Sequence, residues 1–240
     1  MSTTSNSKCN PGDTPPPPMT SKIFTKKDLQ LHSKKSPHAL DAEIKRALKN
    51  RKLIKLKRGL YAKTETYLNE SNKLQFAEFL ASQIHSPSYL SLNYVLHKHG
   101  LMPNTEDAST YTSITLKNAS ENRNFLGTFR YSNLKKSLYY GFQEVTYDGH
   151  IYSVATKAKA LFDYLYLEPK LQYRNQRKLK YNLFTKLRLS LENFFEKDFQ
   201  EFEDYVWKSN CKKMMRIRHC LESHFANKKF DIWAKEFLKG

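Results

Sequence analysis

Residues 36–62 constrain the fold more than any other stretch of this chain, because a helical period runs directly into a strand–turn–strand pattern. Ser36 is a suitable helix N-cap, and Pro37 suits the first helical position, where its missing N–H has no partner to lose. The apolar residues that follow repeat at helical spacing and predict one buried stripe. The members of this stripe are Leu40, Ile44, Ala47 and Leu48.

The opposite face of this predicted helix carries three cations and no acid. At about 100° per residue, that face collects a histidine, an alanine and three basic residues. They are His38, Ala42, Lys45, Arg46 and Lys49. Asp41 and Glu43 fall toward the flanks and the N-terminal end, where negative charge suits the helix dipole.

Residues 53–56 and 60–62 predict two short strands around the basic turn Lys57-Arg58-Gly59. A core-packed helix with a cationic outer face, followed by a basic hairpin, predicts a winged helix-turn-helix over residues 21–65. In that fold the helix enters the DNA major groove and the hairpin lies along phosphates. We expect Lys45, Arg46 and Lys49 to meet the groove or its phosphates. We expect His38 and Ala42 to lie nearer to base edges, and Lys57 and Arg58 to contact the DNA backbone. A solvated basic surface without a ligand is the simpler alternative.

The positive charge of the chain is segregated along the sequence. Of 240 residues with a formal net charge of +18, residues 22–63 hold 14 Lys and Arg against 3 acids. Residues 71–169 hold 9 against 8, and residues 170–240 hold 17 against 9. This distribution of a basic head, a neutral middle and a basic tail favours an anionic partner, nucleic acid before membrane.

The domain organisation predicted from these patterns is α+β, with a small N-terminal winged helix-turn-helix and a larger mixed α/β domain with a helical C-terminus. Residues 1–20, which include Pro15 to Pro18, predict a disordered tail. The larger domain is expected over residues 71–240, with a strand-rich middle at 108–155 and a helical tail at 187–240. Helices are predicted at 71–84, 91–99, 157–167, 198–208, 211–225 and 231–238. Strands are predicted at 111–116, 124–131, 140–147 and 150–154, and residues 170–186 are expected to form an exposed loop.

Motifs for catalysis and for metal or cofactor binding are missing from the sequence. It has no nucleophile elbow, no glycine-rich phosphate loop and no HExxH motif. Asp163 and Glu168 are five residues apart on one predicted helix and are interpreted as surface acids. Cys220 and His224 provide only two potential ligands, too few for a metal site. Three cysteines and no long apolar run favour a soluble, cytoplasmic protein with no membrane partner.

Basic residues in the tail are the candidates for binding a protein partner. They form two runs, Arg174, Arg177, Lys178 and Lys180 in the first and Lys212, Lys213, Arg216 and Arg218 in the second. The first run is interleaved with Tyr173, Tyr181 and Phe184, which are also suited to stacking on single-stranded nucleic acid. Docking of a protein partner and local packing remain alternatives for this segment.

Several segments occur in the order found in a known family. FTKKDL, LIKLKRGLYA, SPSYLSLNYVLHKHGLMP and VATKAKALFDYLYL span residues 23–170 in motif order. This order resembles the AbiEi-type antitoxins of bacterial type IV toxin–antitoxin systems, which act in abortive infection. The resemblance implies a winged-helix repressor that binds double-stranded operator DNA of its own operon. It also implies neutralisation of a cognate nucleotidyltransferase-like toxin, and no enzymatic activity of the chain itself.

Two other function classes remain open from the sequence. One is a nucleic-acid-processing enzyme or RNA-binding protein that uses the basic C-terminal region. The other is a protein whose charge serves only to bind an acidic partner. Protection of a repeated site upstream of the chain's own gene would favour the repressor, whereas duplex binding without sequence preference would favour the nucleic-acid-processing class.

Overall fold

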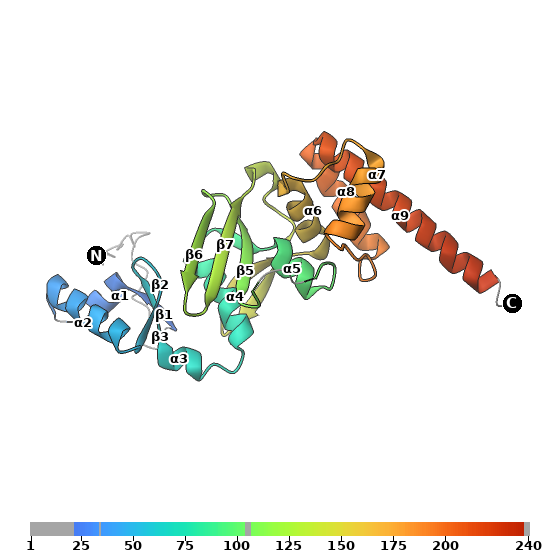
Figure 1. The fold of residues 1–240 in the computed structure, drawn as a ribbon. Coiled ribbons are helices and arrows are strands. Elements are labelled where there is room, and N and C mark those ends of the chain that lie inside the picture. Colours follow the sequence, from blue (N-terminus) through green and yellow to red (C-terminus); the bar gives the residue numbers. More distant parts are fainter. Residues whose placement is uncertain (1–21, 34, 104–106, 238–240) are drawn as a thin grey trace, which may run out of the picture. The chain divides into compact units, whose positions relative to one another are not determined.

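The computed structural model describes residues 22–33, 35–103 and 107–237, of which the last twelve are described as backbone only (Figure 1). These residues contain nine α-helices and two β-sheets, so the chain is of mixed α/β class. It divides into two compact units, Met1–Lys73 (unit 1) and Leu74–Gly240 (unit 2). None of the described helices combines the length and the apolar character needed to cross a membrane.

Unit 1 contains a small antiparallel sheet with strand order β1-β3-β2 and three helices. Its elements are β1 (Ile23–Thr25), α1 (Lys26–Leu31), α2 (Pro37–Lys49), β2 (Leu53–Lys57), β3 (Leu60–Lys63) and α3 (Thr64–Leu68). The core joins Phe24, Leu40, Ile44 and Tyr61, with Leu29, Leu48 and Leu53 packed at its edge. Apolar residues from the sheet and from α2 thus bury each other, as the helical stripe predicted.

Side-chain caps fix where the first two helices begin. Thr25 and Asp28 form a capping box, in which the Thr25 N–H donates to Asp28 Oδ2 at 2.6 Å and the Asp28 N–H donates to Thr25 Oγ1 at 3.2 Å. At α2, Ser36 Oγ accepts from the Ala39 N–H at 3.3 Å. The predicted cap, helix and hairpin of residues 36–62 are therefore confirmed.

Two elements of unit 1 were not predicted. Residues 23–25 form strand β1, which pairs with β3 through Phe24 and Tyr61. Residues 64–68 form helix α3. The predicted tail at residues 1–20 lies outside the described residues.

Unit 2 contains a six-stranded sheet of order β6-β7-β5-β4-β9-β8 (Figure 1). The strands are β4 (Ser88–Leu90), β5 (Thr110–Thr115), β6 (Ser120–Asn124), β7 (Gly127–Asn133), β8 (Phe142–Tyr147) and β9 (His150–Ala155). The helices are α4 (Lys73–Ile84), α5 (Leu92–Lys98), α6 (Lys157–Leu167), α7 (Gln176–Tyr181), α8 (Glu196–Ser209) and α9 (Lys212–Phe237). A 3-10 turn (Lys136–Leu138) and a π-helical segment (Asn182–Lys186) complete it.

Helix α4 packs against the sheet through aromatic side chains. Phe79 lies 5.7 Å from the ring of Tyr147 and 5.0 Å from that of His150, and the Tyr131 hydroxyl donates to the Ala81 carbonyl at 2.6 Å. Helices α6 to α9 gather at the other end of this unit in Figure 1, where α6 packs with α5 and α8. Thr156 caps α6, since Thr156 Oγ1 accepts from the Lys159 N–H at 3.1 Å.

Several sequence predictions for unit 2 are wrong. Residues 170–186 were expected to form a loop, but they contain α7 and the π-helical segment. One strand was expected over 124–131, where the chain forms the β6–β7 hairpin. Two helices were expected at 211–225 and 231–238, but α9 runs without interruption to Phe237. Strand β4, a separate segment of three residues, was missed.

Candidate functional sites

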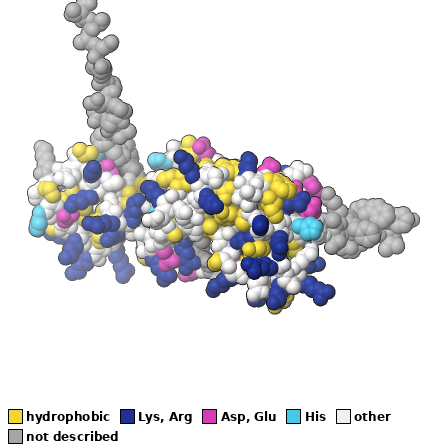
Figure 2. Space-filling model, turned by 90° about the horizontal axis from the view of Figure 1, so that it is seen from above, with side chains coloured by type: hydrophobic (Ala, Val, Ile, Leu, Met, Phe, Trp, Pro, Cys, Tyr) yellow, Lys and Arg dark blue, Asp and Glu magenta, His cyan; other side chains and the backbone are white. Residues whose placement is uncertain are grey.

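The outer face of α2 presents its predicted side chains to solvent. His38, Ala42, Lys45, Arg46 and Lys49 are all exposed. Figure 2 shows Lys and Arg side chains crowded on the displayed face of unit 1, at the left, with few acidic side chains between them. The structure therefore brings all five predicted residues of this helix onto one surface.

The acids of α2 are compensated by lysines from outside the helix. Asp41 pairs with Lys26 of α1 at 2.6 Å, and Glu43 pairs with Lys35 at 2.8 Å. In contrast, the three cations at positions 45, 46 and 49 have no ion-pair partner among the residues described. Their charge is therefore available to an external anion.

The β2–β3 hairpin forms the second basic feature of unit 1. Its tip turns at Gly59, which has a φ of +77°, as the tight turn predicted. The Gly59 carbonyl accepts from the Lys26 N–H at 3.3 Å, and this bond ties the tip to the start of α1. Arg58 is exposed at the turn, whereas Lys57 is half-buried.

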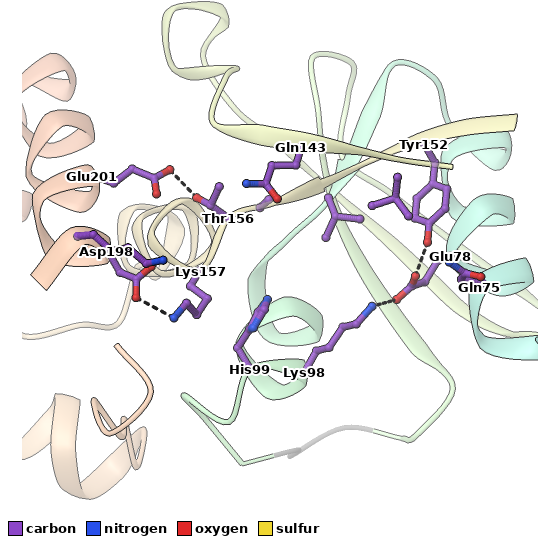
Figure 3. A pocket seen from close by; sticks show the side chains of 14 residues that line it. Gln75, Glu78, Lys98, His99, Gln143, Tyr152, Thr156, Lys157, Asp198 and Glu201 are labelled. Atoms are coloured by element: carbon purple, nitrogen blue, oxygen red, sulfur yellow. Dashed lines mark hydrogen bonds and ion pairs between the residues drawn. The ribbon is translucent and has the colours of Figure 1, made fainter. Parts of the chain in front are cut away.

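A recess of about 530 Å³ opens in unit 2 between α4 and α5 on one side and α6 and α8 on the other (Figure 3). Its most buried polar group is Glu78, whose carboxylate is 1% exposed. This carboxylate accepts from the Tyr152 hydroxyl at 2.6 Å, from Lys98 Nζ at 2.6 Å and from the Tyr94 hydroxyl. Burial and the Glu78 carboxylate both raise the pKa of Tyr152, so its hydroxyl stays a proton donor.

The opposite wall of this recess carries two more carboxylates. Asp198 pairs with Lys157 at 2.7 Å, and Glu201 accepts from the Thr156 hydroxyl at 2.6 Å. Burial lowers the pKa of His99 at the rim, and the nearby Lys157 lowers it further. No three His, Cys, Asp or Glu side chains converge on a metal position in the part of the chain that the structure describes. The carboxylates of the recess thus all accept hydrogen bonds from within unit 2, and those of Glu78 and Asp198 are also paired with lysines.

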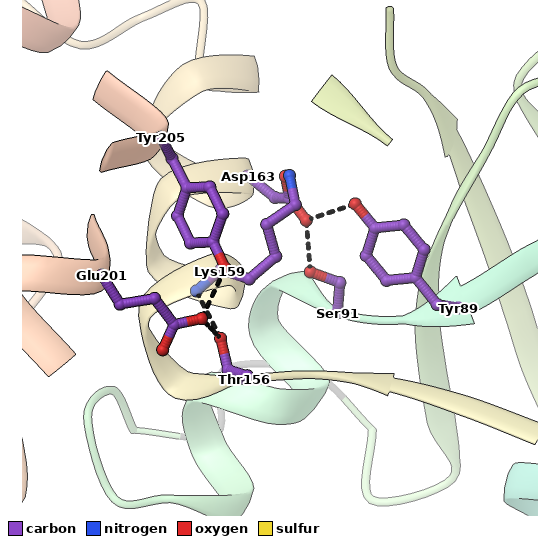
Figure 4. Close-up of polar contacts among 7 residues, drawn as sticks. All are labelled: Tyr89, Ser91, Thr156, Lys159, Asp163, Glu201 and Tyr205. Atoms are coloured by element: carbon purple, nitrogen blue, oxygen red, sulfur yellow. Dashed lines mark hydrogen bonds and ion pairs between the residues drawn. The ribbon is translucent and has the colours of Figure 1, made fainter. Parts of the chain in front are cut away.

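A second polar cluster lies inside unit 2 (Figure 4). Lys159 Nζ and Asp163 Oδ1, both fully buried, are 2.6 Å apart. Asp163 Oδ2 also accepts from the Tyr89 hydroxyl at 2.9 Å and from the Ser91 hydroxyl at 2.8 Å. The interpretation of Asp163 as a surface acid is therefore wrong. Burial raises the pKa of Asp163 and lowers that of Lys159, and the pairing opposes both shifts.

Neither cluster was recognised from sequence, although each carries a signal. Glu78 interrupts the apolar run FAEFLA, and Lys159 and Asp163 lie four apart in AKALFDYL. A helical run that is apolar on all its faces is buried, so a charge within it is buried as well and needs a partner. Apart from the Lys159–Asp163 pair within α6, the partners come from other helices and strands and could not be read from the sequence.

The two basic runs of the tail lie next to each other in the structure. Arg216 Nη1 donates to the Arg174 carbonyl at 2.9 Å, which joins α9 to the segment before α7. Six of the eight predicted residues are exposed, namely Arg174, Arg177, Lys178, Lys180, Lys212 and Arg216. A recess of about 450 Å³ lies between the two helices and is lined by residues of both runs.

The other two predicted cations have partners inside unit 2. Lys213 Nζ donates to the carbonyls of Tyr166 at 2.8 Å and Glu168 at 3.1 Å, and burial lowers its pKa. Arg218 pairs with Glu203 at 2.6 Å and with Glu222 at 3.0 Å. These two side chains brace α9 against its neighbours and are less available to a ligand.

Cys220 and His224 are placed by packing. Cys220 is buried, and burial raises the pKa of its thiol. The His224 ring stacks on Phe184 at 4.5 Å between centroids. Phe184, expected to be available for stacking on bases, is therefore engaged with a neighbouring helix.

Comparison with protein-family models gives no match for this chain, and comparison with curated proteins gives none either.

Proposed function

We propose that unit 1 is a winged helix-turn-helix that binds double-stranded DNA. Helix α2 is the recognition helix, and the β2–β3 hairpin is the wing. In this arrangement Lys45, Arg46 and Lys49 contact the major groove or its phosphates. Arg58 positions the wing on the backbone, with Lys57 beside it.

The observation that carries this proposal is the charge compensation on α2. Asp41 and Glu43 are paired with Lys26 and Lys35, so neither acid opposes the approach of a phosphate. Cations without an internal partner can neutralise DNA phosphates, and the DNA then releases its condensed counterions, which drives binding.

The motif order supports a more specific proposal. The chain acts as an AbiEi-like antitoxin that represses its own operon through unit 1, while unit 2 neutralises a nucleotidyltransferase-like toxin. The proposal contains no catalytic step and no cofactor.

The experiment is a titration of the full-length chain against duplex DNA from upstream of its own gene, over a range of salt concentrations. Replacing Lys45, Arg46 and Lys49 together by Ala should weaken binding and lower the magnitude of the salt slope by about 2 to 3, because each lost phosphate contact removes about 0.9. Arg58→Ala should weaken binding with little change in sequence preference, since phosphate contacts position without specifying.

A matched control removes the same charge from the same unit. Lys27, Lys52 and Lys63 are exposed and lie off the outer face of α2. Changing these three to Ala should leave most of the affinity and the slope in place. Equal losses of affinity in the two triple variants would show that binding depends only on net charge. In that case α2 would not be the recognition helix.

A further inference from the structure

We infer that the surface between α7 and α9 binds single-stranded nucleic acid, as a second site that does not depend on unit 1. The sequence favoured a protein partner for these cations. The side chains that line the recess and the cations around it favour a polynucleotide.

The recess between the two helices has the groups that hold an unstacked base. It is lined by Tyr173, Arg174, Gln176, Leu179, Met215, Arg216 and His219. An aromatic ring and guanidinium groups provide planar surfaces on which a base stacks. An amide and an imidazole provide hydrogen-bonding groups for a base edge or a ribose hydroxyl. The volume of about 450 Å³ is larger than one planar base requires.

The recess is held open by contacts that leave these groups available. Arg216 is anchored through Nη1 to the backbone carbonyl of Arg174. The Arg174 guanidinium itself is exposed and has no ion-pair partner among the described residues. Leu179 and Met214 bury the inner sides of the two helices. No acid is among the described residues that line the recess. Glu222 lies 3.6 Å from His219 of the lining and is also paired with Arg218.

Cations outnumber acids around the recess. Residues 170–188 hold seven Lys and Arg and no acid. Lys212 of α9 adds to these, and it has no ion-pair partner within the described part of the chain. A continuous run of cations matches the repeated charge of a phosphate backbone. A duplex would keep its bases stacked and leave the recess empty, so a single strand fits this site better.

The test uses the full-length chain carrying Lys45→Ala, Arg46→Ala and Lys49→Ala, so that duplex binding by unit 1 is weakened. Binding of labelled mixed-sequence single strands of about 15 nucleotides, as RNA and as DNA, is followed by fluorescence anisotropy beside the matching duplex. We expect at least one single strand to bind more tightly than the duplex. Tighter binding of RNA than DNA would assign contacts to the 2′-hydroxyl, and equal binding would assign the affinity to stacking and phosphates.

Three further variants locate the site. Tyr173→Leu, which removes the ring and keeps apolar bulk, should weaken single-strand binding roughly tenfold. Arg174→Ala with Lys212→Ala should weaken it and lower the salt slope by about 1.4, at about 0.7 per contact. The matched control, Lys135→Ala with Lys136→Ala, removes two exposed cations elsewhere in unit 2 and should have no such effect.

The inference is overturned if neither single strand outcompetes the duplex, or if Tyr173→Leu binds as tightly as its parent while melting at the same temperature. It is also overturned if the control pair of substitutions weakens single-strand binding as much as the pair at the recess does. Since unit 1 carries the triple substitution throughout, none of these outcomes bears on duplex binding by α2.

Discussion

At the scale of single residues, the Asp163 carboxylate is stabilised inside an apolar interior by three neighbours at once, Lys159, Tyr89 and Ser91. Burial is the largest influence on the pKa of both Asp163 and Lys159, and it disfavours both charges. Asp163→Ala should therefore lower the free energy of unfolding by about 3 to 5 kcal/mol, because the Lys159 ammonium would stay buried without a counter-charge.

The double variant Lys159→Met with Asp163→Leu is the informative comparison. It removes both charges and should cost much less than Asp163→Ala alone, as measured by urea unfolding of the full-length chain. A double variant less stable than Asp163→Ala would show that the ion pair itself, and not the orphaned ammonium, carries the stability.

Gly59 is the residue on which the hairpin turn depends. Its φ of +77° is open to Gly and tolerable for Asn, but strained for a β-branched side chain. A Cβ added there meets no atom within 4 Å, so the effect of a substitution is conformational and not a clash. Gly59→Val should lower stability by about 1 to 3 kcal/mol, while Gly59→Asn should cost much less. Equal melting temperatures for both variants would contradict a strained turn.

At the scale of elements, the start of α2 is set by one hydroxyl. Ser36 Oγ accepts from the Ala39 N–H, and no other side chain is recorded as capping this helix. Ser36→Ala should cost about 1 kcal/mol of stability, and Ser36→Asp should recover most of it. Thermal unfolding of the two variants measures this, and a Ser36→Ala protein that melts like its parent would assign the start of α2 to Pro37 alone.

The elements that were predicted correctly from the sequence are those determined by residues close together along the chain. The stripe of α2, its Ser36 cap and the Gly59 turn each depend on neighbours along the chain. Strand β1 is three residues long and exists only because β3 pairs with it from about 37 residues away. The helical part of residues 170–186 was missed because its charges masked two buried leucines, Leu179 and Leu183.

The same distinction between local and long-range contacts applies to the candidate sites. The cations of α2 could be placed on one face by periodicity alone. The sequence could not show that these cations lack ion-pair partners among the described residues. The acids of α2 are instead paired with Lys26 and Lys35, which approach from other segments. Likewise Glu78 meets Tyr152, and Asp163 meets Tyr89, across separations of 74 residues each. Contacts of that kind are set by strand order, which the sequence did not provide.

At the scale of the whole molecule, the two compact units predict that the two proposed activities can be separated. Helix α4 begins at Lys73, so a cut before Ser71 leaves its first turn intact. Residues 71–240 should fold and neutralise the toxin without repressing, because the large core of unit 2 is its own. A growth-rescue assay run beside a promoter-reporter assay on the same fragments measures both activities. Rescue by residues 1–70 in place of residues 71–240 would reverse this division of labour.

The burial of Lys159 has a chemical consequence. Its ammonium lies within 5.9 Å of the ring centres of Tyr89, Tyr140, Phe162 and Tyr205, and none of its side chain reaches the surface. An acylating reagent in the solvent therefore meets this amine only when unit 2 opens, whereas exposed lysines such as Lys45 react at once. The rate at which Lys159 is acylated therefore measures how often unit 2 opens and exposes its interior to water.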